Sequence, residues 1–266
     1  FVVLYIIPFI ICSTSVLSFE PFNLTIINFI ILPLFFYFIV YINKKTKGFY
    51  RKKPYKKNFF IFGLLFGLGF YLSGISWITH SLTFDDSFKF LIPFALILIP
   101  LFLGLFTAFT TLFIGPYLKF NLTSVIIFSG SIAFSDYLRA KLFTGFPWNL
   151  WAYSTSWSNE ILQILNPIGL YSYNLVVITF FTLPVIIFLR INIIKKMLIF
   201  LLFFLLILVF YIYGNYEINM NKKLLNNNSQ SIFVKIISPN FDLQYGLSSK
   251  QIEERFKKLI RYSDPN

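Results

Sequence analysis

The chain has 266 residues, of which 57% are apolar and only 12% charged, and its formal net charge is +13. A soluble domain carries about 25% charged residues, so the composition excludes an ordinary soluble protein and indicates an integral membrane protein. The single cysteine, Cys12, excludes an internal disulfide. Because Cys12 lies in an apolar stretch, we interpret it as a small buried side chain rather than a nucleophile.

Seven apolar stretches follow one another along the chain, and each approaches the roughly 20 residues that a helix needs to span the hydrocarbon. Backbone groups in lipid must be hydrogen-bonded internally, so we predict helices. The expected fold is a polytopic α-helical membrane bundle, with kinks at prolines such as Pro33, Pro100 and Pro184. The seven stretches are roughly 1–17, 24–42, 59–80, 90–117, 122–138, 162–189 and 197–214.

Basic residues are concentrated between the second and third stretches, where residues 43–57 hold eight Lys or Arg. No nucleic-acid motif or aromatic stacking platform accompanies them, so we interpret this segment as a cytoplasmic loop and expect no nucleic-acid partner. With the N-terminus inside, the inner loops 43–58, 118–121 and 190–196 hold twelve basic residues and the outer loops three. This asymmetry places everything after residue 214 outside the cytoplasm.

The pattern changes after residue 214. Residues 215–230 are rich in Asn and Lys and are interpreted as a linker, and residues 231–238 (SIFVKIIS) predict a short buried strand. Ser248 and Gln251 form a capping box that opens an amphipathic helix. The apolar positions of that helix are Ile252, Phe256, Leu259 and Ile260.

The sequence therefore divides into three parts: a helix bundle over 1–214, a linker over 215–230, and the start of an extracytoplasmic α/β domain over 231–266. A segment of about 35 residues is too short to fold alone. We therefore expect the α/β domain to continue beyond residue 266.

The outer loop predicted over 139–161 is the best candidate for a functional surface. It contains three Trp, and Gly145, Phe146, Pro147 and Trp148 stand in a row. An aromatic belt at the headgroup level explains the composition. A lipid-facing wall of a site at the outer surface also explains it, and the Gly-Phe-Pro-Trp run favours a specific turn.

Ionisable residues near the predicted outer surface form two further groups. His80 lies close to Asp85 and Asp86, but the spacing matches no metal-ligand pattern, so we assign no metal site. Asp136 and Arg139 are three residues apart and are expected to pair across one helical turn. A structural ion pair is the simpler interpretation, and a substrate contact is the alternative.

Several motifs occur in the order found in one family. They are LSFEPFN (17–23), GLGFYLSGISWI (67–78), LFTGFPWNLWAYS (142–154) and LNPIGLYSYNLV (165–176), followed by IFVKIISPN (232–240). With these motifs the chain resembles bacterial apolipoprotein N-acyltransferases over nearly its whole length. The GFPW segment followed by Pro-Ile-Gly-x-Tyr is the most specific part.

The resemblance implies a multi-pass protein of the bacterial inner (plasma) membrane that carries a nitrilase-like α/β domain on the periplasmic side. Its implied reaction moves an acyl chain from a phospholipid donor to the N-terminal cysteine of a diacylated lipoprotein acceptor, through a thioester on a catalytic Cys. A Glu would act as base and a Lys would help to hold the oxyanion. No cofactor is implied.

The resemblance also implies where the site residues lie. The catalytic Glu, Lys and Cys are expected beyond residue 266, so no catalytic residue is assigned in this chain and the chain alone is expected to be inactive. Phe146, Pro147 and Trp148 are the implied substrate-binding residues. One departure is that Pro239 is followed by Asn240 where the family has Pro-Gln. The alternative function is a polytopic transporter or a non-catalytic membrane anchor for an outer domain, although the inverted repeats typical of transporters are not evident.

Overall fold

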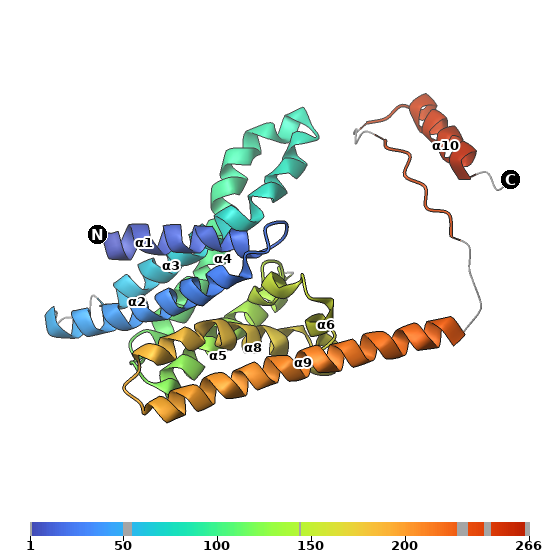
Figure 1. Ribbon diagram of the computed structural model, residues 1–266. Coiled ribbons are helices and arrows are strands. Elements are labelled where there is room, and N and C mark those ends of the chain that lie inside the picture. Colours follow the sequence, from blue (N-terminus) through green and yellow to red (C-terminus); the bar gives the residue numbers. More distant parts are fainter. Residues whose placement is uncertain (1, 50–54, 144, 228–233, 242–245, 264–266) are drawn as a thin grey trace.

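The computed structural model of the protein describes residues 2–49, 55–143, 145–227, 234–241 and 246–263. Within these ranges all regular secondary structure is helical (Figure 1). The α-helices are α1 (Val2–Ser13), α2 (Asn28–Phe49), α3 (Tyr55–Ile75), α4 (Ile92–Ile114), α5 (Leu122–Lys141), α6 (Asn159–Leu162), α7 (Leu165–Ile168), α8 (Leu170–Thr182), α9 (Ile193–Asn227) and α10 (Ser249–Ser263). The 3-10 helices are η1 (Thr14–Ser18), η2 (Thr25–Ile27), η3 (Ser76–Thr83), η4 (Asp86–Leu91), η5 (Trp151–Thr155) and η6 (Leu183–Phe188).

A membrane location is supported by the length and hydropathy of the helices. Five helical segments in the described residues are long and apolar enough to cross a bilayer. They are Thr25–Lys45, Lys56–Thr83, Asp86–Ile114, Leu170–Phe188 and Ile193–Leu225. The first predicted stretch forms a shorter apolar helix, Leu4–Ser18, and the fifth forms α5, which buries Asp136 and Arg139 among its polar residues. A helical membrane bundle is therefore confirmed, whereas the count of seven spans stays a prediction.

The connections gather at the two ends of the bundle. The C-terminal end of α2, the α4–α5 connection and the α8–α9 connection lie at one end, on the left of Figure 1. The α5–α6 connection and the C-terminal half of α9 lie at the other end. The described parts of the three basic loops predicted to be cytoplasmic thus share one end, as alternating spans require.

Close packing of aromatic and small residues forms the centre of the bundle. Phe35 of α2 stacks on Phe66 of α3 with ring centroids 3.6 Å apart. Between α3 and α4 the backbones nearly touch, because a Cβ built on Gly67 would lie 2.7 Å from the Cα of Gly104. Cys12 is buried, as its position in an apolar stretch predicted. Small residues at such crossings let membrane helices approach closely.

Two helices differ from the predicted spans. The stretch 162–189 was expected to be one helix, but it is divided into α6, α7, α8 and η6, and Gly169 with a φ of 77° separates α7 from α8. Conversely, α9 does not end at residue 214 and continues through much of the predicted linker. Asn219 hydrogen-bonds Asn215 one turn earlier, at 3.1 Å, so polar side chains that suggested a loop support the helix instead.

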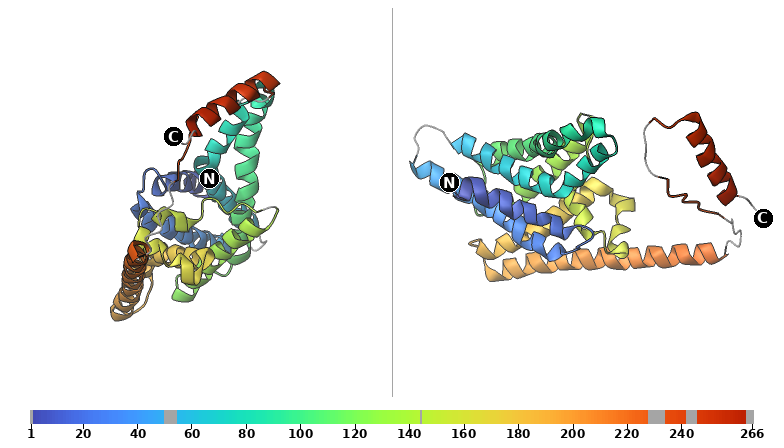
Figure 2. Two further views of the ribbon diagram at one scale, coloured as in Figure 1. Left: turned by 90° about the vertical axis from the view of Figure 1, so that its right-hand side faces the viewer. Right: turned by 90° about the horizontal axis from the view of Figure 1, so that it is seen from above.

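The C-terminal segment stands apart from the bundle in Figures 1 and 2. Residues 234–241 have no regular secondary structure, so the predicted strand 231–238 is not formed there, and its first three residues lie outside the described ranges. A strand requires a partner strand, and the described residues include none. The predicted capping box is confirmed, because the Ser248 N–H donates to Gln251 Oε1 at 2.9 Å ahead of α10.

Candidate functional site

The turn that follows α5 presents the Gly-Phe-Pro-Trp segment. Helix α5 ends at Lys141, so residue 139, the predicted start of the loop, still lies in the helix. Gly145 has a φ of 80°, a conformation that glycine adopts without strain, and a Cβ there would lie 2.4 Å from the Ala140 carbonyl oxygen. The Phe146 N–H then donates back to the Arg139 carbonyl at 3.0 Å. Glycine is therefore needed for the chain to reverse here.

The buried side chain of Arg139 binds the backbone of this turn. Its side chain is only 1% exposed, and Nη1 donates to the backbone carbonyls of both Phe146 and Trp148. Its Nη2 lies 3.2 Å from Asp136 Oδ1, and the guanidinium lies 5.1 Å from the centre of the Tyr71 ring on α3. The predicted Asp136–Arg139 pair is confirmed, and it also fixes the backbone of the loop.

Asn174 extends the polar network to α8. This fully buried side chain donates from Nδ2 to Asp136 Oδ2 at 2.9 Å, and its Oδ1 accepts from the Ala152 N–H at 2.9 Å. A buried charge is tolerated only when it is paired and hydrogen-bonded. Through these contacts α3, α5, α8 and both halves of the loop are tied to one buried ion pair.

The aromatic residues of the loop divide into exposed and buried groups. Trp148 is 48% exposed and stacks on Trp77 of η3, which is 52% exposed, with centroids 4.9 Å apart. Phe146 lies beside Trp148 at 6.0 Å. Trp151 is instead buried and stacks on Phe70 at 4.8 Å. A simple aromatic belt does not describe this arrangement, because only some of the rings face outward.

The second half of the loop is fixed to the start of α2. Thr25 donates from Oγ1 to the Ser154 carbonyl at 2.7 Å, and Asn28 Nδ2 donates to Ser154 Oγ at 3.0 Å. The exposed Trp157 donates from Nε1 to Thr25 Oγ1 at 2.9 Å. The loop is thus held at both ends, with Trp148 exposed and Phe146 and Pro147 half-buried between them.

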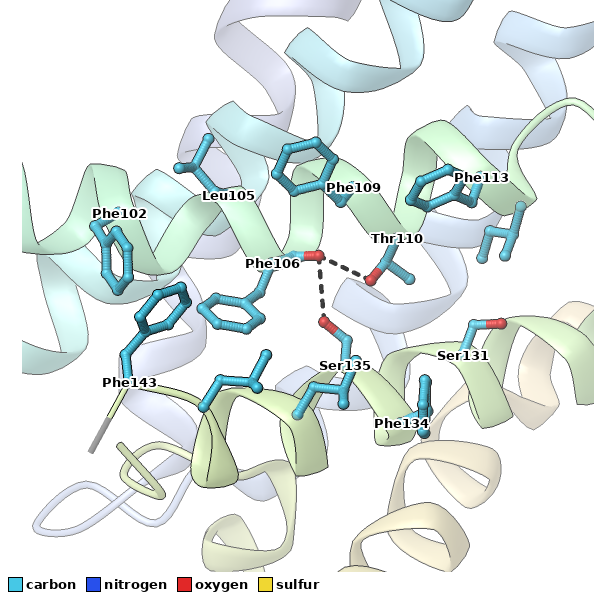
Figure 3. Close-up of a pocket in the computed structure, with 13 residues that line it drawn as sticks. Phe102, Leu105, Phe106, Phe109, Thr110, Phe113, Ser131, Phe134, Ser135 and Phe143 are labelled. Carbon is cyan, nitrogen blue, oxygen red and sulfur yellow. Dashed lines mark hydrogen bonds between the residues drawn. The ribbon is translucent and has the colours of Figure 1, made fainter. Parts of the chain in front are cut away.

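An apolar groove runs from Phe146 along α4 and α5 (Figure 3). Its outer part, of about 310 Å³, is lined by Arg139, Gly145 and Phe146 together with residues of α4. Its larger part, of about 570 Å³, continues between α4 and α5. The two parts share four lining residues, Phe102, Phe106, Leu142 and Phe143. The candidate site therefore combines an aromatic edge with a long apolar groove.

The remaining ionisable candidates do not join this site. His80 packs on Phe84, Asp85 accepts from the Ser87 N–H, and Asp86 pairs with Lys89. Among the described residues, no group of three His, Cys, Asp or Glu side chains is placed to hold a metal ion. Helix α10, which carries Glu253 and Glu254, stands apart from the bundle in Figure 1.

The sequence predicted Phe146, Pro147 and Trp148 as substrate-binding residues of one outer loop, which stays a prediction, and it missed the residues that support the turn. The role of Asn174 and Tyr71 had no local signal, because each meets Asp136 or Arg139 only through helix packing. The groove was also missed, since Phe102 and Phe143 belong to different predicted elements. An Asp and an Arg inside an apolar helix were the only hint that a buried network existed.

Comparison with known proteins decides the family. The profile of the apolipoprotein N-acyltransferase N-terminal domain matches residues 13–183, which is well over half of the chain and includes the whole Arg139 network. The chain belongs to the apolipoprotein N-acyltransferase family.

Several relatives that are similar to this chain are named apolipoprotein N-acyltransferase. The apolipoprotein N-acyltransferase of Bradyrhizobium diazoefficiens is 32% identical over 173 residues, which cover 65% of this chain and 31% of the relative. That of Rickettsia typhi is 32% identical over 175 residues, covering 65% of this chain and 32% of the relative. That of Rickettsia bellii is 36% identical over 117 residues, covering 44% and 23%. The matched region is thus about a third or less of the length of these relatives.

Proposed function

We propose that this chain is the membrane platform of a phospholipid-dependent lipoprotein N-acyltransferase. The whole enzyme would move an acyl chain from a phospholipid to the α-amino group of the diacylglyceryl-cysteine at the N-terminus of a lipoprotein. The observation that carries the proposal is the family match over residues 13–183. The hydrogen-bonded turn within the matched region, which borders an apolar groove through Phe146, supports it.

We place the platform in the bacterial inner membrane with the Phe146–Trp148 turn on the periplasmic side. Basic residues support this orientation, because the described parts of the predicted inner loops lie at the opposite end of the bundle and carry nine Lys or Arg. The α10 segment would then begin the nitrilase-like domain on the periplasmic side. In this orientation the turn faces that domain.

In the proposed reaction, a catalytic Cys thiolate attacks the ester carbonyl of the phospholipid, and the lysophospholipid leaves as its alcohol. The lipoprotein amine then attacks the thioester and releases the thiol. The Glu, Lys and Cys that perform these steps would come from the part of the protein after residue 266. Cys12 does not fit the role, since it is fully buried in the bundle.

The residues of this chain would bind and orient the substrates. The rings of Phe146 and Trp148, with Trp77 beside them, form an apolar edge on which acyl chains can pack. Arg139 fixes the backbone beneath that edge, and a reacting ester must be positioned closely for attack. The platform would thus contribute orientation, whereas the outer domain would contribute the nucleophile.

Acyl transfer by the full-length gene product in proteoliposomes tests the proposal. The substrates are a phospholipid with a labelled acyl chain and a synthetic diacylated lipopeptide with a free α-amine. We expect the label on the lipopeptide amine, and we expect a thiol-alkylating reagent to abolish transfer. Absence of transfer from folded, membrane-inserted protein would favour a non-catalytic anchor, and transfer by residues 1–266 alone would contradict the placement of the nucleophile.

A further inference from the structure

The groove between α4 and α5 has the shape of an elongated channel. Its lining extends along α4 from Phe102 to beyond Phe113, a distance of about 16 Å at 1.5 Å per residue. Figure 3 shows Phe102, Phe109 and Phe113 along one wall and Phe143, Ser135 and Ser131 along the other. The groove therefore follows the helices from the proposed acyl-binding edge toward the opposite end of the bundle.

Three of the described residues that line the groove carry a hydroxyl group: Thr110, Ser131 and Ser135. The hydroxyl groups of Thr110 and Ser135 both donate to the Phe106 carbonyl oxygen, at 2.8 and 3.2 Å. Among the residues that the structure describes, Arg139 at the outer part is the one ionisable side chain that lines the groove. Water in such a space would lack the two to four polar partners that it needs.

The groove cannot stay empty inside a bilayer. An unfilled groove would deprive its lining of dispersion contacts, and α4 belongs to a segment long and apolar enough to span the membrane. Three of its lining side chains, Leu98, Phe109 and Phe113, are exposed and would face lipid. The filler available at this depth is hydrocarbon.

We propose that the α4–α5 groove holds one acyl chain of the phospholipid donor, with the ester end beside the Phe146–Trp148 turn and the methyl end near Phe113. This assignment rests on the proposed function. Continuity between the two parts of the groove supports it, because the outer part borders Gly145 and Phe146. The donor fits better than the acceptor, since bulk phospholipid lies against every lipid-facing groove, whereas the acceptor chains are attached to a protein.

Photolabelling of the 266-residue chain tests the assignment without requiring acyl transfer. The chain is placed in nanodiscs with phosphatidylethanolamine that carries a diazirine either near the ester or near the methyl end of one chain. On illumination the diazirine loses N₂ and the carbene inserts into a nearby C–H bond, and the labelled residue is found by mass spectrometry. We expect the near-ester probe at Phe102 and Phe143, and the near-methyl probe at Phe109 and Phe113.

Two matched variants give the control. Thr110→Phe fills the groove, whereas Thr179→Phe changes a threonine on α8 that also bonds the carbonyl one turn earlier, Leu175, but lies outside the groove. We expect Thr110→Phe to lower groove labelling severalfold and Thr179→Phe to leave it unchanged. The wild-type pattern remains decisive if Thr110→Phe fails to fold.

Labels spread evenly over the groove and the exposed face of α9 would overturn the inference. A groove without any label would also overturn it, and would mean that another helix covers the groove. The two proposals fail in distinguishable ways. A labelled groove without acyl transfer by the full-length protein would reject the proposed function and leave a hydrocarbon site. Acyl transfer with an unlabelled groove would reject only the groove assignment.

Discussion

Arg139 of α5 donates a hydrogen bond from Nη1 to the backbone carbonyl of Trp148 across 2.8 Å. This contact fixes the backbone of the residue with the most exposed ring of the GFPW turn. The guanidinium that makes the contact is buried and is also paired with Asp136. A charge at this depth is costly unless its hydrogen-bonding groups are engaged. The arrangement explains why α5 contains an ion pair in an otherwise apolar stretch.

Replacing Arg139 is expected to destabilise the bundle. Arg139→Met leaves Asp136 buried without its cation, and breaking one side of a buried pair costs about 3–5 kcal/mol. The free energy of unfolding in detergent micelles measures the loss. Arg139→Met combined with Asp136→Leu removes both charges and should recover part of the loss, because the carbonyls of Phe146 and Trp148 still lack their donor. A single variant as stable as wild type would contradict the role assigned to the pair.

Asn174 is expected to contribute through two hydrogen bonds. Asn174→Leu keeps a similar volume but leaves the Ala152 N–H and Asp136 Oδ2 without this partner, and each buried unsatisfied group costs about 1–3 kcal/mol. Asn219→Leu, on the exposed face of α9, is the matched control and should change the unfolding free energy little. Equal effects of the two substitutions would mean that the network carries no stability.

Gly67 is expected to tolerate no side chain. In Gly67→Ala the new Cβ would meet the Cα of Gly104 at 2.7 Å, so α3 and α4 would have to separate, and overpacking of this kind costs about 1–3 kcal/mol. In Gly130→Ala on α5 nothing lies within 4 Å of the new Cβ. That control should be neutral or more stable by up to about 1 kcal/mol, because alanine favours a helix. Thermal unfolding of both variants measures their stabilities, and a Gly67→Ala variant as stable as Gly130→Ala would contradict the close packing of α3 on α4.

Cys12 is expected to react slowly with a membrane-permeant maleimide. Its side chain is fully buried beside α2 and α3, so modification requires opening of the bundle. A Ser81→Cys, Cys12→Ala chain, with its thiol on the exposed surface of η3, should react much faster. Mass spectrometry of the modified protein over time gives both rates, and equal rates would show that α1 is not packed as described.

The sequence predicted what depends on local pattern. Hydropathy located the helices of the bundle, and the Ser248–Gln251 box marked the start of α10, because each signal lies within a few residues. The predicted end of the last span at residue 214 was wrong, since α9 continues to Asn227. Asparagine is frequent in loops, but here its side chains hydrogen-bond along the helix. The break at Gly169 was missed because the apolar pattern continues through it.

Some residues of the candidate site could be predicted from the sequence, and others could not. Phe146, Pro147 and Trp148 stood out as a contiguous motif, and the Asp136–Arg139 pair follows from helical spacing. Their connection does not follow from the sequence, because Arg139 reaches Trp148 through the φ of Gly145 and Asn174 reaches Asp136 through the packing of α8 on α5. The groove likewise arises where Phe102 and Phe143 meet from separate elements, with ring centroids 5.5 Å apart.

Acyl transfer by the full-length gene product carrying Trp148→Ala tests the central claim most directly, with Trp157→Phe as the control in the same loop. Loss of the Trp148 ring removes apolar surface on which an acyl chain would pack, and burial of a large apolar side chain contributes about 1.5–3 kcal/mol, so we predict a loss of at least about tenfold in kcat/KM. Folding should be retained, because the Trp148 carbonyl that Arg139 binds is still present. A Trp148→Ala enzyme as active as Trp157→Phe and wild type would contradict the claim that this turn binds the acyl substrates.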